Sequence, residues 1–258
     1  MTVFTSLDDY RRFAHSLRSE RRFVHAKHVR SFLDAVAASV TPRVEILVRN
    51  TRFWRAQIGS IPGEVVIDAS GDTATVDFPL KPERMMPLPT RARENRANPH
   101  GIPALYVASH RDTAIAEIGA RKHSIVTVAS LLATRDLSIV NATLETDHNL
   151  WLGNEEPEGE VLERMVWGQI DYAFMRPVTR ADDAADYAPT QVLAELFRQL
   201  GYDGVAYASS YGEGHNVALF DLESARVEAA QVSRVTDMKL TVNHEYGESY
   251  RIPHVDSQ

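Results

Sequence analysis

Three segments of the chain place reactive side chains next to constrained backbone, and the first carries an arginine in a turn. Arg96 begins the run Arg-Ala-Asn-Pro-His-Gly, and the apolar segment 102–108 follows it. A Pro/Gly turn can hold an arginine at a strand end, where the guanidinium binds phosphate or carboxylate through two parallel hydrogen bonds. Such a charge-assisted contact contributes about 1.5–3 kcal/mol. The alternative interpretation is a surface arginine beside a turn.

The second segment contains a glutamate among small and apolar residues. On a helix, Thr113 and Ala114 lie one turn before Glu117, so the carboxylate emerges from a close-packed apolar surface. A carboxylate in such surroundings is costly unless a positive group pairs with it. Glu117 is therefore a candidate partner for a cationic reaction centre. A half-exposed helix glutamate is the alternative.

The third segment, residues 201–216, predicts a strand that runs into a Ser-Ser, Gly-rich turn and then into a second strand. Ser209 and Ser210 lie where the first of these strands ends. Hydroxyl groups and bare backbone at a strand end suit contact with a ligand. A plain hairpin has the same pattern, so this segment alone indicates no more than a pocket.

Several classes of site are excluded by what the sequence lacks. It has no cysteine, which rules out disulfides, thiolate metal sites and thiol nucleophiles. The phosphate loop, the Gly-x-Gly-x-x-Gly fingerprint and the nucleophile elbow are also missing. His25 and His28 have no third ligand nearby and are interpreted as surface residues. We therefore expect neither a metal nor a bound cofactor.

The elements that must position these residues are mixed along the chain. Helices are predicted in residues 7–17, 23–40, 112–122, 159–174 and 189–200. Short β-rich runs occupy residues 44–48, 64–68, 73–78, 104–108, 125–128, 137–140, 204–208 and 216–222. Helices and strands alternate without a regular βαβ rhythm, which favours an α+β fold. Residues 141–186 are strongly acidic, and part of this stretch is expected to be an exposed connection.

Charge separates the first fifth of the chain from the rest. The 258 residues carry a net charge of −7, but residues 1–50 form a basic helical N-terminal region. Its basic face is interpreted as a solvated helical surface, with contact to nucleic acid as the alternative; the acidic remainder argues against nucleic acid. The sequence predicts no signal peptide and no membrane span. A cytoplasmic location is expected, although export by a specialised machine leaves no such mark.

Together the three segments resemble the RES domain, a toxin family named for an arginine, a glutamate and a serine and usually encoded beside an Xre-type antitoxin. The resemblance covers residues 53–222 in the expected order, and the spacing of Arg96, Tyr106 and Glu117 is its most specific part. The matching runs are Phe53-Trp54-Arg55, Arg96-x-Asn98-Pro99-x-Gly101-x-Pro103-x-Leu105-Tyr106-x-Ala108, Thr113-Ala114-x-Ala116-Glu117, Tyr187-x-x-Thr190-Gln191, and Asp203-Gly204-x-x-Tyr207-x-Ser209 with Asn216 through Phe220.

The resemblance implies both a fold and an activity. The fold would be an ADP-ribosyltransferase-like split mixed β-sheet with flanking helices around an NAD cleft, formed by residues 51–258. The activity would use NAD as a substrate and cleave its nicotinamide–ribose bond by hydrolysis or phosphorolysis. Nicotinamide leaves as a neutral molecule, so the ribose passes through an oxocarbenium-like state. Glu117 would stabilise that cation, which contributes about 10²–10³ in rate.

Roles for the other residues also follow from the resemblance. Arg55 and Arg96 would hold the pyrophosphate or the nearby ribose, and Tyr106 would stack on nicotinamide or a ribose face. Ser209 would hydrogen-bond the nicotinamide amide or the ribose, with Ser210 as the alternative if the alignment slips by one. Four further candidates are as suited to fixing turns and a helix start as to touching NAD: Asn98, Tyr187, Gln191 and Asn216.

Some features depart from the family pattern. Glu94-Asn95 stands where Gly-Gly often precedes the turn arginine, and Ala97 replaces an aromatic residue. The chain is also longer than the family pattern and adds the basic N-terminal region, a hairpin near residues 64–78 and the acidic stretch around residues 145–186. These additional regions could provide self-blocking, oligomerisation or attachment to a delivery system instead of a toxin–antitoxin role. A cognate antitoxin or immunity protein and a homo-oligomer are the expected partners besides NAD. The alternative functions are protein mono-ADP-ribosylation and a non-catalytic NAD-sensing or nucleic-acid-binding module.

Overall fold

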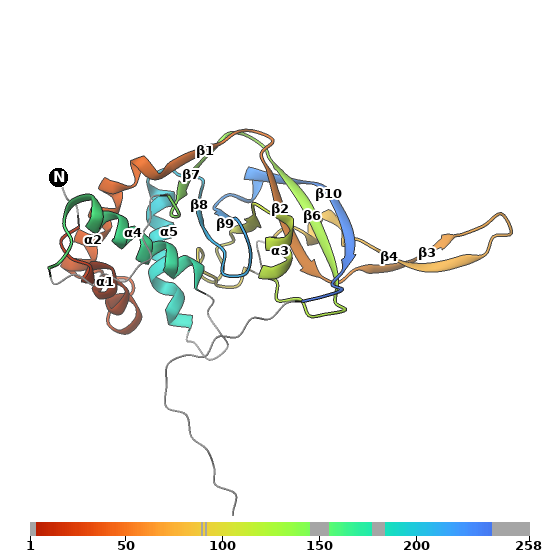
Figure 1. The fold of residues 1–258 in the computed structure, drawn as a ribbon, viewed down its shortest axis with the longest axis horizontal. Coiled ribbons are helices and arrows are strands. Elements are labelled where there is room, and N and C mark those ends of the chain that lie inside the picture. Colours follow the sequence, from red (N-terminus) through yellow and green to blue (C-terminus); the bar gives the residue numbers. More distant parts are fainter. Residues whose placement is uncertain (1–3, 89, 91, 145–154, 177–183, 239–258) are drawn as a thin grey trace, which may run out of the picture.

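The computed structural model describes residues 4–88, 90, 92–144, 155–176 and 184–238. A mixed sheet of eight strands forms the centre, most of the helices gather at one end, and a two-stranded arm projects from the other end (Figure 1). The predicted α+β fold, with a mixed sheet and flanking helices, is confirmed. Among the described residues, no helix is both long enough and apolar enough to cross a membrane.

The main sheet almost divides into two halves between β2 and β5. These strands pair only at Trp54 and Ala108, whereas β2 pairs with β6 and β5 with β9 along most of their lengths. Strands β7 and β8 are parallel, and the other neighbours are antiparallel. The order is β1-β7-β8-β9-β5-β2-β6-β10. The strands span Val44–Leu47 (β1), Arg52–Ile58 (β2), Leu105–Ala108 (β5), Ile125–Ala133 (β6), Leu137–Asn141 (β7), Gly204–Ala208 (β8), His215–Leu219 (β9) and Ala225–Arg234 (β10).

Four helices cover one face of the half that contains β7, β8 and β9. One buried cluster joins them to the sheet, with the Phe13 and Phe32 rings 4.5 Å apart in a tilted arrangement and Trp167 stacked on Phe197 at 6.3 Å. The basic N-terminal region therefore shares its core with the rest of the chain. A further helix, α3 (Arg111–Glu117), packs against β2, β5 and β6. The four helices span Asp8–Ser19 (α1), Lys27–Ser39 (α2), Gly159–Met175 (α4) and Ala188–Gln199 (α5).

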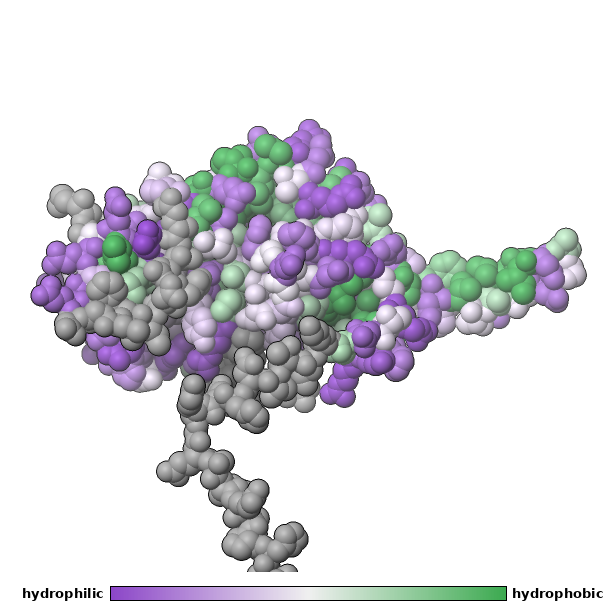
Figure 2. Space-filling view, viewed as in Figure 1, coloured by the Kyte–Doolittle hydropathy of each residue, from purple (hydrophilic) through white to green (hydrophobic). Residues whose placement is uncertain are grey.

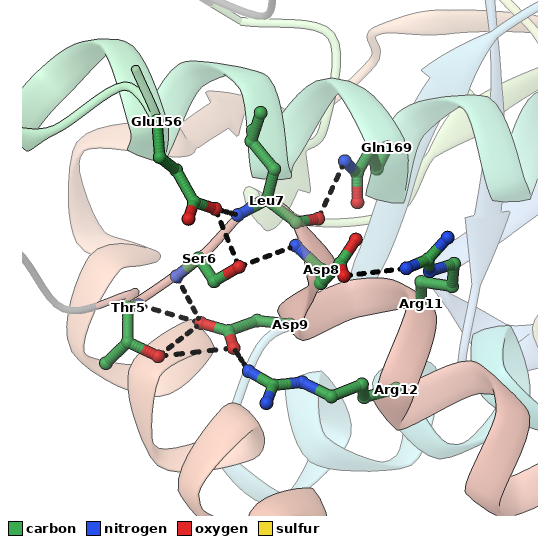
Figure 3. Close-up of polar contacts among 9 residues, drawn as sticks. All are labelled: Thr5, Ser6, Leu7, Asp8, Asp9, Arg11, Arg12, Glu156 and Gln169. Carbon is green, nitrogen blue, oxygen red and sulfur yellow. Dashed lines mark hydrogen bonds and ion pairs between the residues drawn. The ribbon is translucent and has the colours of Figure 1, made fainter. Parts of the chain in front are cut away.

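Polar contacts fix the start of α1 to α4 and to the segment before it (Figure 3). The Asp9 carboxylate accepts a hydrogen bond from the backbone N–H of Ser6 at 3.0 Å. Glu156 accepts from the Ser6 hydroxyl at 2.6 Å and from the backbone N–H of Leu7 at 2.7 Å. The Gln169 amide donates to the Leu7 carbonyl. These contacts link residues about 150 positions apart and hold the N-terminal helices on the domain.

The second predicted helix begins later than expected. Phe23 and Val24 were assigned to it, but α2 starts at Lys27, and both side chains lie in the preceding loop with exposed fractions of 91% and 74%. This part of the prediction is wrong because spacing alone does not distinguish an apolar loop from the first turn of a helix. The basic face is solvent-exposed as predicted, at Arg11, Arg12, Arg18, Arg21, Arg22, Lys27 and Arg30.

Other boundaries also differ from the prediction. Strands β2 and β10 were not predicted, β6 extends to Ala133, and α3 ends at Glu117 instead of near residue 122. Gly119, with φ of +60°, turns the chain just after α3 and explains the early end. Within the acidic stretch 141–186, α4 is the predicted helix with its buried apolar stripe, and Glu155, Glu156 and Glu158 before it are exposed. Residues 145–154 and 177–183 of that stretch lie outside the described residues.

The projecting arm is the hairpin predicted around residues 64–78. Its strands are Ile61–Val66 (β3) and Thr73–Phe78 (β4), which pair from Ile61 and Phe78 at the base to Val66 and Thr73 near the tip. Hydrophobic residues run along the arm beyond the body of the protein (Figure 2). β4 touches β10 where the arm leaves the main sheet.

Candidate active site

The end of α3 meets the ends of β8 and β9 at Glu117. Oε1 of this carboxylate accepts a hydrogen bond from the Ser209 hydroxyl at 2.8 Å and another from the side-chain amide of Asn216. Among the described residues, Oε2 accepts no hydrogen bond. Three of the predicted site residues, which are up to 99 positions apart, are thus in direct contact. Asn216 is 6% exposed and lies beneath the carboxylate.

Strand alternation places further side chains on the same face of the sheet. Tyr207 is paired with Asn216 across β8 and β9, and Ser209 follows Tyr207 by two positions. Directly paired residues and residues two apart point to the same face. Tyr106 of β5 belongs to this face as well, because Ala108 pairs with Asn216. This is the face that α4 and α5 cover, so the Glu117 group lies at the margin of the helical core.

Tyr207 lies close to Arg96, a contact that the sequence analysis did not predict. The Arg96 guanidinium is 5.9 Å from the centroid of the Tyr207 ring. Burial raises the pKa of Tyr207 to about 12; the positive charge of Arg96 opposes this shift, and the negative charge of Glu117 adds to it. The charges of Arg96 and Glu117 therefore both act on one buried phenol.

The turn that carries Arg96 is fixed by residues from three elements. The Tyr106 hydroxyl donates to Asn98 Oδ1 at 2.7 Å and accepts from the Ala97 N–H at 2.9 Å. Asn98 donates to three carbonyl groups of its own turn, and Gln191 of α5 donates to the carbonyls of Asn95 and Asn98. Burial raises the pKa of Tyr106 well above its usual value, so its hydroxyl stays protonated and can donate. Asn98, Tyr106 and Gln191 thus hold the backbone that presents Arg96.

Arg55 lies where the two halves of the sheet separate. It belongs to β2, and Nη1 donates to the Tyr106 carbonyl of β5 at 2.6 Å, two residues before the only β2–β5 pair at Ala108. Its Nε is buried and has no hydrogen-bond partner among the residues that the structure describes. Burial lowers the pKa of Arg55. Within the described part of the chain, no carboxylate lies within 4.0 Å of the Arg55 or Arg96 guanidinium.

The two remaining candidates lie at the border of this group. The Ser210 hydroxyl donates to the Met175 carbonyl at the end of α4, so it is directed away from Glu117. Tyr187 precedes α5, where its carbonyl accepts from the Thr190 hydroxyl. Tyr187 is close enough to act electrostatically on both Tyr106 and Tyr207.

The loop between β8 and β9 is held tightly against α3. The Thr113 hydroxyl donates to the Glu213 carbonyl, and the Ser109 hydroxyl accepts from the His215 N–H at 3.0 Å. Gly214 has φ of +84° and passes so close to Ser109 and His110 that a Cβ would overlap them. These contacts fix the loop that carries Ser209. No group of three or more metal-ligating side chains occurs among the described residues.

Comparisons with known proteins add the following. A family model described as RES domain matches residues 73–243, a range that includes Arg96, Glu117 and Ser209 but not Arg55. A chain in the crystal structure of the M. tuberculosis MbcT–MbcA toxin–antitoxin complex aligns with 14% identity and a TM-score of 0.41, over 78% of this chain and 92% of that chain. No curated protein matches the sequence.

Proposed function

The chain belongs to the RES domain family, and we propose that it acts as a toxin that consumes NAD by cleaving the bond between nicotinamide and ribose. The contact of Ser209 and Asn216 with one oxygen of Glu117 carries this proposal. Two donors on Oε1 fix the carboxylate without neutralising it. Its second oxygen, Oε2, is then the atom that faces the ribose of bound NAD.

The proposed reaction needs a fixed negative charge more than a proton donor. When the bond from ribose C1′ to nicotinamide breaks, its electron pair stays on the ring nitrogen and cancels the positive charge of the ring. The ribose becomes oxocarbenium-like, and the Glu117 carboxylate stabilises that charge electrostatically. An oxygen of water or phosphate then bonds to C1′, and water loses its proton to the solvent.

The two arginines supply the charge that holds the pyrophosphate. Arg55 and Arg96 have no carboxylate partner among the described residues, so their charges are available to an anion. Guanidinium groups bind phosphate oxygens in pairs of parallel hydrogen bonds. Tyr106 is linked to both arginines: its carbonyl accepts a hydrogen bond from Arg55, and its hydroxyl accepts one from the Ala97 N–H in the turn that carries Arg96. Tyr106 is therefore proposed to position both arginines, besides stacking on the substrate.

Product analysis tests the proposal. Purified protein is incubated with NAD in the presence and absence of phosphate, and small molecules and protein are analysed by mass spectrometry. Nicotinamide release is expected, with ADP-ribose as the co-product of hydrolysis or its phosphate ester as that of phosphorolysis. ADP-ribose attached to protein would instead identify a protein acceptor. A cognate antitoxin or immunity protein, the partner implied by the family, is expected to block the release.

A pair of glutamate variants makes the test specific. Glu117→Gln keeps the size of the side chain and removes its charge, so nicotinamide release should fall about 10²–10³-fold. Glu195→Gln makes the same change on an exposed position of α5 and should leave the rate unchanged. Equal activity of both variants, or the absence of nicotinamide release from the unaltered protein, contradicts the proposal.

A further inference from the structure

The arm, defined here as residues 59–80, carries apolar side chains that no other described segment of the chain covers beyond its base. Alternation along β3 and β4 puts Ile61, Val65, Val76 and Phe78 on one face, and the Phe78 ring lies across Gly63. Val66 and Ile67, near the tip, have exposed fractions of 68% and 62%. An isolated two-stranded hairpin is at best marginally stable in water. A partner at the tip would bury these side chains.

The arm is also uniformly acidic. It contains Glu64, Asp68, Asp72 and Asp77 and no lysine, arginine or histidine. The Asp68 carboxylate accepts hydrogen bonds from the hydroxyl and N–H of Ser70 and from the N–H of Asp72. These bonds order the tip as a compact acidic turn next to Ile67. A partner for the tip must therefore offer both positive charge and an apolar surface.

The opposite end of the same molecule has these properties. Residues 18–30, called here the basic end, connect α1 to α2 and contain four cations with no carboxylate within 4.0 Å in the described part of the chain: Arg21, Arg22, Lys27 and Arg30. Phe23 and Val24 lie between these cations, almost fully exposed. A cavity of about 510 Å³ shares Lys27 and His28 with the basic end and is otherwise lined by Thr5, Asp9, Arg12, Ser31, Phe32 and Ala35. It has room for apolar side chains of the size of isoleucine.

These two surfaces cannot meet within one molecule, because α1 and α2 lie at one end of the long axis and the arm projects from the other end (Figure 1). We propose that the arm of one molecule docks onto the basic end of a second copy. The acidic tip would face the cations of the basic end, and Val66 and Ile67 would cover Phe23, Val24 and the adjoining cavity. Charge of opposite sign and apolar surface are thus matched on both sides of the contact.

The geometry of this contact sets its consequences. The two copies contribute different patches, so a dimer formed by one such contact still has one free arm and one free basic end. The assembly therefore grows head to tail or closes as a ring. A hairpin tip on a helical loop buries less than the roughly 1,600 Å² of a standard interface, which predicts weak association. Its charged contacts are exposed, so added salt weakens it.

Sedimentation velocity of the full chain tests the proposal. The mean mass should rise with protein concentration at about 0.05 M salt and should rise less at about 0.5 M salt. Glu64→Lys combined with Asp72→Lys changes the net charge of the arm from −4 to zero and keeps the Asp68 carboxylate that orders the turn. Arg21→Glu combined with Arg22→Glu changes the net charge of the basic end from +4 to zero. Each double variant should remain monomeric, and Glu223→Lys, an exposed charge reversal elsewhere, should associate like the unaltered protein.

Mixing the two double variants gives the sharpest result. The arm variant keeps an intact basic end and the other keeps an intact arm, so an equimolar mixture should form dimers and nothing larger. Circular dichroism and thermal melting establish that each variant is folded. A monomeric unaltered protein, association that both variants retain, or a mixture that stays monomeric overturns the proposal, and the last outcome would instead indicate a different partner for the arm.

Discussion

Asn216 donates its side-chain amide to Oε1 of Glu117, from a buried position in β9 to the end of α3. The two residues are 99 positions apart, and the contact exists because β9 pairs with both β5 and β8. The amide is a fixed donor with no charge of its own. It orients the carboxylate and leaves its negative charge intact.

Removing that donor should slow the reaction. A hydrogen bond to a charged group contributes about 1.5–3 kcal/mol, so Asn216→Ala should reduce kcat for nicotinamide release about 10–100-fold. Asn216→Asp puts a second carboxylate beside Glu117, and the like charge raises the pKa of one of them. The pH profile of Asn216→Asp should therefore shift to higher pH. Gln199→Glu, on the exposed end of α5, should leave the profile in place. An unshifted pH profile for Asn216→Asp would mean that Asn216 does not influence nicotinamide release.

The adjacent serines should behave differently. Ser209→Ala removes a donor to Glu117 and should lower kcat about tenfold. Ser210→Ala removes a hydroxyl that binds the Met175 carbonyl instead, so it should change kcat little. Steady-state kinetics of the two variants, measured side by side, check this. A larger loss for Ser210→Ala would mean that Ser210 is the reactive serine of the family pattern.

Arg96 should act through the shape of its side chain as well as its charge. Arg96→Lys keeps the positive charge and loses the forked donors, so KM for NAD should rise about 10–100-fold. Arg93→Lys makes the same change on an exposed neighbour whose carbonyl accepts from Asn98, and KM should stay constant. Equal KM values for the two variants would remove Arg96 from the binding of NAD.

His215 should make stability depend on pH. Burial lowers its pKa from the usual 6.5, the negative charge of Glu45 opposes the shift, and the nearby His110 adds to it. Below about pH 6.5 the unfolded chain binds a proton at His215 that the folded chain does not bind. The free energy of unfolding should therefore fall as pH decreases from 7.5 towards the lowered pKa. Urea denaturation across this range measures the fall, and His215→Gln should reduce its slope. An identical slope in the variant would assign the effect to other groups.

The sequence predicted elements with strong local patterns and missed those defined by distant pairing. The periodic helix α5 and the apolar strand β8 lie close to their expected positions. β10 mixes charged and apolar residues because one side of this edge strand is exposed, and only its pairing with β6 identifies it. β2 was missed for a similar reason, since Arg52, Arg55 and Gln57 interrupt its apolar residues.

In the candidate site too, contacts that depend on distant parts of the chain were not predicted. Tyr207 was part of the family pattern, yet its contact with Arg96 depends on how β8 packs against the Arg96 turn. Asn98 and Gln191 were left between a structural and a ligand-binding role, and their hydrogen bonds are to backbone carbonyls of the Arg96 turn. The sequence thus predicted that these residues lie near one another, but the hydrogen-bond partners of each side chain follow only from the fold.

The central claim is that the Glu117 carboxylate faces the ribose of NAD while Arg55 and Arg96 hold its phosphates. A crystal structure of the Glu117→Gln variant soaked with NAD tests it most directly, because the slowed reaction should leave the substrate intact. The account predicts the ribose within hydrogen-bond distance of residue 117 and the pyrophosphate against both guanidinium groups. NAD bound elsewhere, for example in the cavity lined by Arg12, Lys27 and His28, with no contact to these three residues, would contradict it.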